Sequence, residues 1–139
     1  MERSLVLIKP DAVARGLSGT IIGRLERQGL KLVAFKMLHL DKKLARKHYA
    51  PHRDKPFFSS LVTYISSAPI VAAVFEGEGA VALIRQAMGA TDPAQAQAGT
   101  IRGDYGLDIE RNVIHGSDSV DTAKGEISLF FTEDEILSY

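Results

Sequence analysis

One histidine, His115, stands where a nucleophile or a proton-transfer group could work. It follows the strand-like run Asn112-Val113-Ile114 and precedes the small and polar residues Gly116-Ser117-Asp118-Ser119, which leave space for a substrate beside the ring. A neutral imidazole has a free lone pair, and its ordinary pKa of about 6.5 keeps it mostly neutral at pH 7. The same pattern is typical of a histidine that simply ends a strand, so this segment alone favours neither interpretation.

Positively charged residues occur in loops or at the ends of predicted elements, where they could meet a phosphate. They are Lys9, Arg85, Arg102, and one of Arg53 or Lys55. Each of them alone is typical of a surface charge. Together with Thr91 and a nucleophilic histidine they would suit phosphoryl transfer, because that reaction mainly requires positive groups around the phosphoryl oxygens.

Two aromatic residues, Tyr49 and Phe57, lie beside this basic stretch. They could be a helix-end tyrosine and a core phenylalanine, or a phosphate-binding hydroxyl and a platform on which a base stacks. Nearby, His48 and His52 have the four-residue spacing of a helical metal pair. Because Pro51 would break such a helix, we predict that both histidines are exposed to solvent and bind no metal.

The composition excludes several kinds of chemistry. The chain has no cysteine, which excludes disulfides, thiolate metal centres and cysteine nucleophiles. It has no GxxxxGKS/T phosphate loop, no GxSxG nucleophile elbow and no HExxH zinc motif. The net charge is zero, but residues 1–70 hold 13 basic and 5 acidic residues, whereas residues 71–139 hold 4 and 12. This asymmetry fits either two halves that attract each other or a basic face for an anion.

The pattern of apolar residues predicts the elements that would position these side chains. We expect strands at 4–9, 30–40, 70–75 (central) and 113–115. In the second strand we expect one side to carry Val33, Phe35 and Met37. We expect helices at 18–29, 42–49, 56–66, 79–88 and 119–131, with Ser18, Asp41 and Ser119 as caps.

Residues 89–111 show little periodicity and contain four glycines, which is typical of a functional loop. The alternation of strands and helices predicts an α/β or α+β sandwich. At 139 residues the chain has the length of one domain, covering 1–139.

With these residues in place, the whole chain resembles the nucleoside diphosphate kinases of the bacterial type. The segment 112–119 is close to the active-site signature of that family. Further blocks match in the same order: Lys9-Pro10-Asp11, His48-Tyr49, Pro56-Phe57-Phe58, Arg85 with residues 89–93, residues 99–104, Glu126-Ile127 and Phe130-Phe131.

The resemblance implies an α+β fold, the ferredoxin-like βαββαβ sandwich with a four-stranded antiparallel sheet and helices packed on it. It also implies that a terminal phosphate moves from a nucleoside triphosphate to a nucleoside diphosphate by a ping-pong mechanism through a phosphohistidine, which maintains the NTP and dNTP pools. Mg²⁺ is the implied cofactor, held mainly by nucleotide phosphates and water and not by a metal site of the protein.

The same resemblance implies the roles of individual residues. His115 would be the nucleophile, Glu126 would orient its ring through the other nitrogen, and Ser117 would support that carboxylate or the leaving oxygen. Phosphate contacts would come from Lys9, Tyr49, Arg85, Thr91 and Arg102. Lys9 and Asn112 would also reach the sugar hydroxyls, and Phe57 would stack on the base.

The resemblance further implies a cytoplasmic homo-oligomer built from dimers, a tetramer in preference to a hexamer, with NTP and NDP as its partners. We expect no membrane among its partners, because the uncharged stretch 56–75 is predicted to be a helix and a strand. We expect no specific nucleic acid either, because the net charge is zero. The alternative, from another class of function, is a ferredoxin-like binding module that keeps the nucleotide pocket but catalyses no phosphate transfer.

Overall fold

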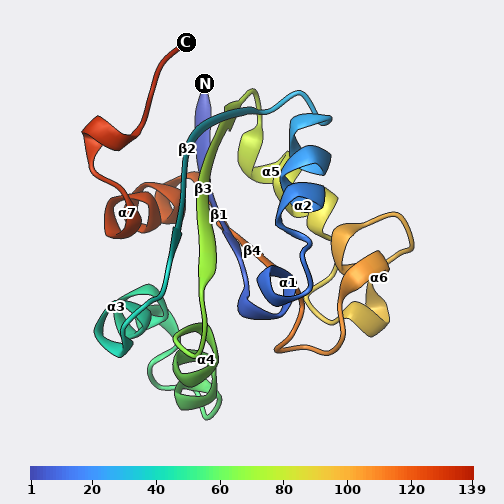
Figure 1. Cartoon of the computed structure of the whole chain (residues 1–139), viewed down its shortest axis with the longest axis vertical. Helices are drawn as coiled ribbons and strands as arrows, with labels where there is room; N and C mark the ends of the chain where they lie inside the picture. Colours follow the sequence, from blue (N-terminus) through green and yellow to red (C-terminus); the bar gives the residue numbers. More distant parts are fainter.

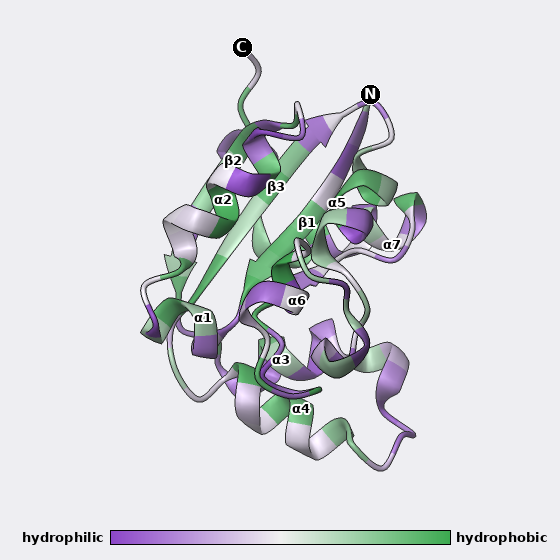
Figure 2. Ribbon diagram, turned by 90° about the vertical axis from the view of Figure 1, so that its right-hand side faces the viewer, coloured by the Kyte–Doolittle hydropathy of each residue, from purple (hydrophilic) through white to green (hydrophobic).

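Four runs of mostly apolar residues form one antiparallel sheet in the computed structural model, which describes residues 1–139 (Figure 1). The strands are β1 (Glu2–Ile8), β2 (Lys31–Leu38), β3 (Ile70–Gly77) and β4 (Ile114–Gly116), in the order β2-β3-β1-β4. The two central strands, β1 and β3, are buried over most of their length, and their apolar character is evident in Figure 2. The prediction that residues 70–75 form a central strand is therefore confirmed.

Helices cover both faces of this sheet because side chains of β1 alternate between two cores. Leu5 and Leu7 face the first core, while Val6 and Ile8 face the second. The first core is closed by α3 (Lys42–His48), α4 (Phe58–Ile65) and α7 (Val120–Phe130). The second is closed by α1 (Pro10–Ala14), α2 (Ser18–Glu26), α5 (Ala80–Met88) and α6 (Ile101–Tyr105). Figure 1 shows these two groups of helices on opposite sides of the sheet.

The chain order β1, α2, β2, β3, α5, β4 is the ferredoxin-like βαββαβ arrangement, with α3 and α4 inserted between β2 and β3. The expected fold class is thus confirmed. Three short 3₁₀ turns complete the chain, at Ala50–His52, Pro93–Gln95 and Glu133–Glu135. None of the helices combines the length and the apolar character needed to cross a lipid bilayer.

The prediction for strand β2 is wrong in one respect. Val33 is buried, but Phe35 and Met37, which were expected on the same side, are 54% and 62% exposed. The pairing of β2 with β3 shifts its register between Leu32 and Ala34. Such a bulge adds one residue to the strand and moves every later side chain to the opposite face. The two large apolar side chains consequently lie on the outside of an edge strand.

Two of the three predicted helix caps are confirmed. Asp41 accepts a hydrogen bond from the Leu44 amide at 2.7 Å, and Ser119 accepts one from the Thr122 amide at 3.1 Å. The third is wrong, since Ser18 is already the first residue of α2 and its side chain makes no capping bond.

The segment 89–111, for which we predicted no regular element, contains the five-residue helix α6. Thr100 caps this helix by accepting a hydrogen bond from the Gly103 amide at 3.0 Å. The helix is too short for its periodicity to be recognised, but it carries Arg102 toward strand β4.

Three ion pairs join the basic half of the chain, residues 1–70, to the acidic half, residues 71–139. The ion pairs Arg3–Glu76, Arg24–Asp104 and Lys36–Glu135 each join a cation of residues 1–70 to an anion of residues 71–139. Surface pairs of this kind contribute little individually, about 0–1 kcal/mol each.

We predict that Gly103→Ala destabilises the protein by about 1–3 kcal/mol, the usual cost of overpacking. A Cβ atom at this position would lie 1.9 Å from the Gln97 carbonyl oxygen, so the loop that carries Arg102 must shift. The matched control is Gly125→Ala in α7, where a Cβ atom meets nothing within 4 Å and alanine should stabilise the helix by about 0.5–1 kcal/mol. Thermal unfolding of both variants measures the difference, and equal effects would contradict the packing seen around Gly103.

Candidate functional site

The ends of strands β1 and β4 bring the first functional residues together. Lys9 follows the last residue of β1, and the antiparallel pairing of β1 with β4 places Leu7 opposite His115. The Lys9 ammonium donates to the Asn112 Oδ1 atom at 2.9 Å and to the Glu110 carbonyl oxygen at 2.7 Å. A buried cation is thereby fixed beside the strand that carries the histidine.

A cavity of about 400 Å³ opens next to this lysine. Seven of the ten predicted site residues line it, although they come from four separate parts of the chain: Lys9, Tyr49, Phe57, Thr91, Arg102, Asn112 and His115. Phe57 is 47% exposed at the cavity, so it is not the core phenylalanine of the alternative interpretation. The other three predicted residues, Arg85, Ser117 and Glu126, lie outside the lining.

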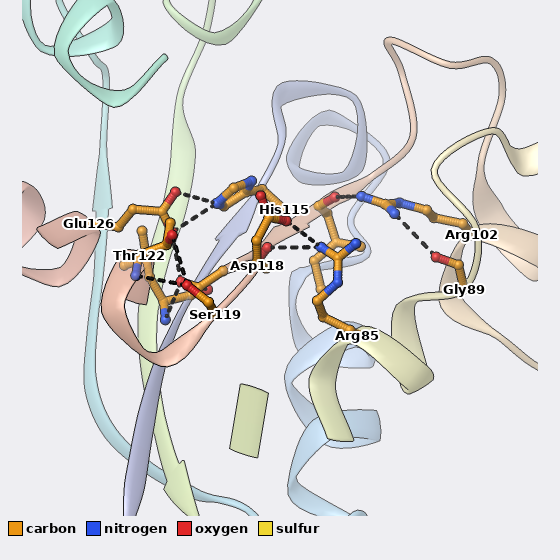
Figure 3. Close-up of polar contacts among 12 residues, drawn as sticks. Arg85, Gly89, Arg102, His115, Asp118, Ser119, Thr122 and Glu126 are labelled. Carbon is orange, nitrogen blue, oxygen red and sulfur yellow. Dashed lines mark hydrogen bonds and ion pairs between the residues drawn. The ribbon is translucent and has the colours of Figure 1, made fainter. Parts of the chain in front are cut away.

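The His115 ring is hydrogen-bonded to a carboxylate through one of its nitrogens. Its Nε2 atom lies 3.2 Å and 3.1 Å from the two carboxylate oxygens of Glu126 (Figure 3). The Ser117 hydroxyl donates to the same carboxylate at 2.6 Å. Burial would raise the pKa of Glu126, but the hydrogen bonds and charge of His115 and the bond from Ser117 outweigh it and lower the pKa. An ionised carboxylate can only accept hydrogen bonds. The proton of the neutral imidazole therefore sits on Nε2, and the free lone pair is on Nδ1.

The two arginines of the site differ in their surroundings. Arg102 is buried and donates to three carbonyl oxygens, those of Gly89 at 3.2 Å, Asn112 at 3.3 Å and Ile114 at 2.7 Å. Burial lowers the pKa of its guanidinium to about 10, which still leaves it charged at neutral pH. It thus ties the segment 89–111 to β4 while presenting charge to the cavity, a structural role that the sequence did not reveal.

Arg85 projects from α5 and is more exposed. It forms an ion pair with Asp118 at 2.8 Å (Figure 3). The same guanidinium reaches the Gly116 carbonyl oxygen at 3.5 Å. Asp118 is itself largely exposed, so the pair lies at the surface next to the His115 strand. Arg53 and Lys55, the other candidate cations, do not line the cavity.

The prediction that His48 is exposed to solvent is wrong. Its side chain is 1% exposed, and its ring packs edge-on against that of His115 at a centroid distance of 4.7 Å. It is the last residue of α3 and also packs against Phe130 of α7. Burial lowers the pKa of His48 to about 3, so the ring is neutral. His52 is half-buried and lines the cavity; the break at Pro51 separates the two rings but does not expose them.

Asp11 is a positioning residue that sequence reasoning did not identify. Val113 has a φ of 68°, a left-handed conformation that a β-branched residue rarely adopts. The Val113 amide donates to the Asp11 carboxylate at 3.2 Å, and the Tyr64 hydroxyl donates to the same carboxylate at 2.6 Å. Asp11 thus holds the strained backbone two residues before His115. Its place in the Lys9-Pro10-Asp11 block could have identified Asp11 from the sequence, whereas no sequence feature pointed to Tyr64.

Comparison with known proteins places the chain beside one family. A family model described as nucleoside diphosphate kinase matches residues 2–136. The nucleoside diphosphate kinase of Dehalococcoides mccartyi is 63% identical over 139 residues, which are 100% of this chain and 98% of that protein. That of Archaeoglobus fulgidus is 59% identical over 100% of this chain and 92% of its own length.

A solved structure agrees with these relatives. The halophilic nucleoside diphosphate kinase from Halobacterium salinarum, in complex with CDP, superposes with a TM-score of 0.96 at 52% identity. The match covers 99% of this chain and 92% of that chain.

We predict that ADP binds more weakly as the pH rises, because of Lys9. Burial lowers the pKa of the Lys9 ammonium to about 8, against the opposing effect of Asp11, so the free protein loses this charge above that pH. A bound phosphate would keep the lysine protonated, which predicts a loss of affinity of about tenfold between pH 7 and pH 9. Calorimetric titration at several pH values measures it.

The matched variant is Lys9→Gln, which should bind ADP more weakly at pH 7 and show a flat profile over the same range. The same fall of affinity in this variant would assign the pH dependence to another group.

Proposed function

The chain belongs to the nucleoside diphosphate kinase family, and from this premise we propose that it transfers the terminal phosphate of a nucleoside triphosphate to a nucleoside diphosphate through a phosphohistidine at His115. The observation that carries the proposal is the bond between Nε2 of His115 and the Glu126 carboxylate. A histidine that merely ends a strand needs no ionised partner, whereas a nucleophile needs its proton held on the other nitrogen.

The proposed first half-reaction is a displacement at phosphorus. The lone pair of Nδ1 attacks the terminal phosphorus, the bond from that phosphorus to the bridging oxygen breaks, and the diphosphate leaves with the electron pair. The proton stays on Nε2, so the phosphorylated ring carries a positive charge that the Glu126 carboxylate balances. The second half-reaction is the reverse, with a different diphosphate as the acceptor, which makes the mechanism ping-pong.

The proposed phosphate contacts come from Lys9, Tyr49, Arg85, Thr91 and Arg102. Arg102 is fixed in place by its carbonyl partners, so it would need no rearrangement when charge develops. Arg85 would have to exchange its bond with Asp118 for a phosphate. Because this ion pair is exposed, its loss costs little, about 0–1 kcal/mol.

The residues of the cavity fit a Mg²⁺ ion that enters with the nucleotide. Mg²⁺ prefers oxygen ligands and often binds through substrate phosphates and water. The side chains that line the cavity are cations, hydroxyls, an amide, aromatic and imidazole rings, three aliphatic groups and one carboxylate. That carboxylate, Glu110, accepts a hydrogen bond from the Ser60 hydroxyl. We therefore assign no side chain as a magnesium ligand. When bound, Mg²⁺ would neutralise charge on the phosphates.

The sugar and base are assigned to the remaining residues. Lys9 and Asn112, which already bind each other, would share the sugar hydroxyls, and exposed Phe57 would stack on the base. We further propose that the protein is a cytoplasmic homotetramer built from dimers that maintains NTP and dNTP pools. The exposed Phe35 and Met37 on the edge strand support association, and light scattering at two protein concentrations distinguishes a tetramer from a dimer or hexamer.

We predict that γ-labelled ATP without an acceptor leaves its label on the protein, in a bond that survives base and is cleaved by acid. This stability is that of a phosphorus–nitrogen bond. His115→Ala should retain no label and lose essentially all phosphotransfer. Its affinity for nucleotide should stay within about tenfold, because other residues make the phosphate contacts.

The result separates the enzyme from the alternative, a binding module without turnover. A wild-type protein that binds ATP but retains no label would be such a module. Turnover of even one per cent in a carefully purified His115→Ala protein would contradict the covalent mechanism.

We also predict broad use of bases. None of the proposed contacts reads a base edge, and stacking on Phe57 accepts any base. ATP, GTP, CTP and UTP should therefore serve as donors with catalytic efficiencies within about 1–3 kcal/mol of each other. Removal of the 3′-hydroxyl should matter more, because Lys9 and Asn112 would lose a partner. A thousandfold preference for one base would contradict this assignment.

A further inference from the structure

His48 is a buried polar side chain that the proposed reaction does not use. The residue is 5% exposed, and neither of its ring nitrogens has a hydrogen-bond partner. Leaving a buried polar group without a partner costs about 1–3 kcal/mol. An apolar residue of similar size would fill the same space without that cost, so the imidazole requires an explanation.

The ring stands next to two groups that also bear lone pairs. Its Nδ1 atom lies 3.8 Å from Glu126 Oε2, too far for a hydrogen bond, and the same oxygen lies 3.1 Å from His115 Nε2. One donor atom from each of the three residues falls within 4.8 Å of the other two. Three donors around a tetrahedral ion, at about 2.0–2.2 Å from it, lie roughly 3.3 Å apart. Small movements of the side chains would produce that arrangement.

The donor set selects the kind of ion. Two imidazole nitrogens and one carboxylate oxygen are typical ligands of zinc and its neighbours among the transition metals, whereas Mg²⁺ and Ca²⁺ take oxygen ligands. The side chains of His115 and Glu126 are 23% and 12% exposed, so an ion can reach the cluster from solvent. A water molecule from that side would complete four-coordination.

We propose that His48, His115 and Glu126 form a binding site for a divalent transition metal ion of the zinc class, and that its occupation inhibits the enzyme. Inhibition rests on the proposed function of His115, but binding does not. Zn²⁺ would bind Nε2 of the neutral tautomer that carries its proton on Nδ1, so the ring proton moves from Nε2 to Nδ1. Nδ1 then has no lone pair with which to attack phosphorus, which is why the metal ion would inhibit the transfer.

The test of binding uses Zn²⁺ alone, without nucleotide, in competition with a chromophoric chelator. We expect one ion per wild-type chain and at least tenfold weaker binding in His48→Phe and in Glu126→Gln. The controls are His39→Gln and His52→Gln, which remove the two histidines outside the cluster and should bind as the wild type does. Equal binding by His48→Phe and the wild type would overturn the proposal.

Two further measurements test the proposal independently of the binding assay. Co²⁺ added to the wild type should give the intense visible bands of a four-coordinate site. If the spectrum shows only the weak bands of six-coordinate Co²⁺, the proposal is overturned. This result does not depend on whether His48→Phe folds. Phosphotransfer at constant excess Mg²⁺ should be inhibited by Zn²⁺ in the wild type, and His48→Phe should need at least tenfold more zinc relative to its own zinc-free activity. The same zinc sensitivity in both proteins would place inhibition elsewhere. A protein that binds zinc but takes no label from ATP would contradict the proposed function only.

Discussion

The bond between the Glu126 carboxylate and Nε2 of His115 is the interaction on which the site depends. The two residues come from different elements, α7 and β4, so their distance is set by how α7 packs on the sheet. Ser119 fixes the first turn of α7, and Ser117 joins the carboxylate to the strand. A helix shifted by one residue would turn Glu126 away and leave both nitrogens of the imidazole free to carry the proton.

The backbone around the histidine is fixed by a second group of charged side chains. Asp11 holds the strained Val113 amide, and Arg102 binds the carbonyl oxygens on either side of it. These bonds join the end of β1, the segment 89–111 and β4 at one place. The charge of Arg102 that we propose for phosphate binding therefore sits on a residue that also joins parts of the fold, which is consistent with a preorganised site.

Much of this could be predicted from the sequence because local signals agreed with the final structure. The apolar runs of β1 and β3 and the caps Asp41 and Ser119 depend on neighbouring residues only, and all are confirmed. The ferredoxin-like fold followed from the resemblance and is also confirmed. The seven predicted residues around the cavity do meet there, although their roles toward substrate remain predictions.

What could not be predicted depends on contacts between distant parts of the chain. The bulge in β2 arises from its pairing with β3, so alternation within β2 gave the wrong side for Phe35 and Met37. The burial of His48 arises from the packing of α3 against α7, while the break at Pro51 describes only the local helix. The carbonyl partners of Arg102 are likewise 10 or more residues away. Sequence patterns carry no information on such distances.

The position of the proton and of the phosphate on the His115 ring tests the central claim most directly. Nitrogen-15 NMR of the imidazole in the free protein should find the proton on Nε2, and phosphorus–nitrogen coupling after reaction with ATP should find the phosphate on Nδ1. Glu126→Gln should lose this preference and give a mixture of the two neutral tautomers. A wild-type ring protonated on Nδ1, or phosphorylated on Nε2, would contradict the account.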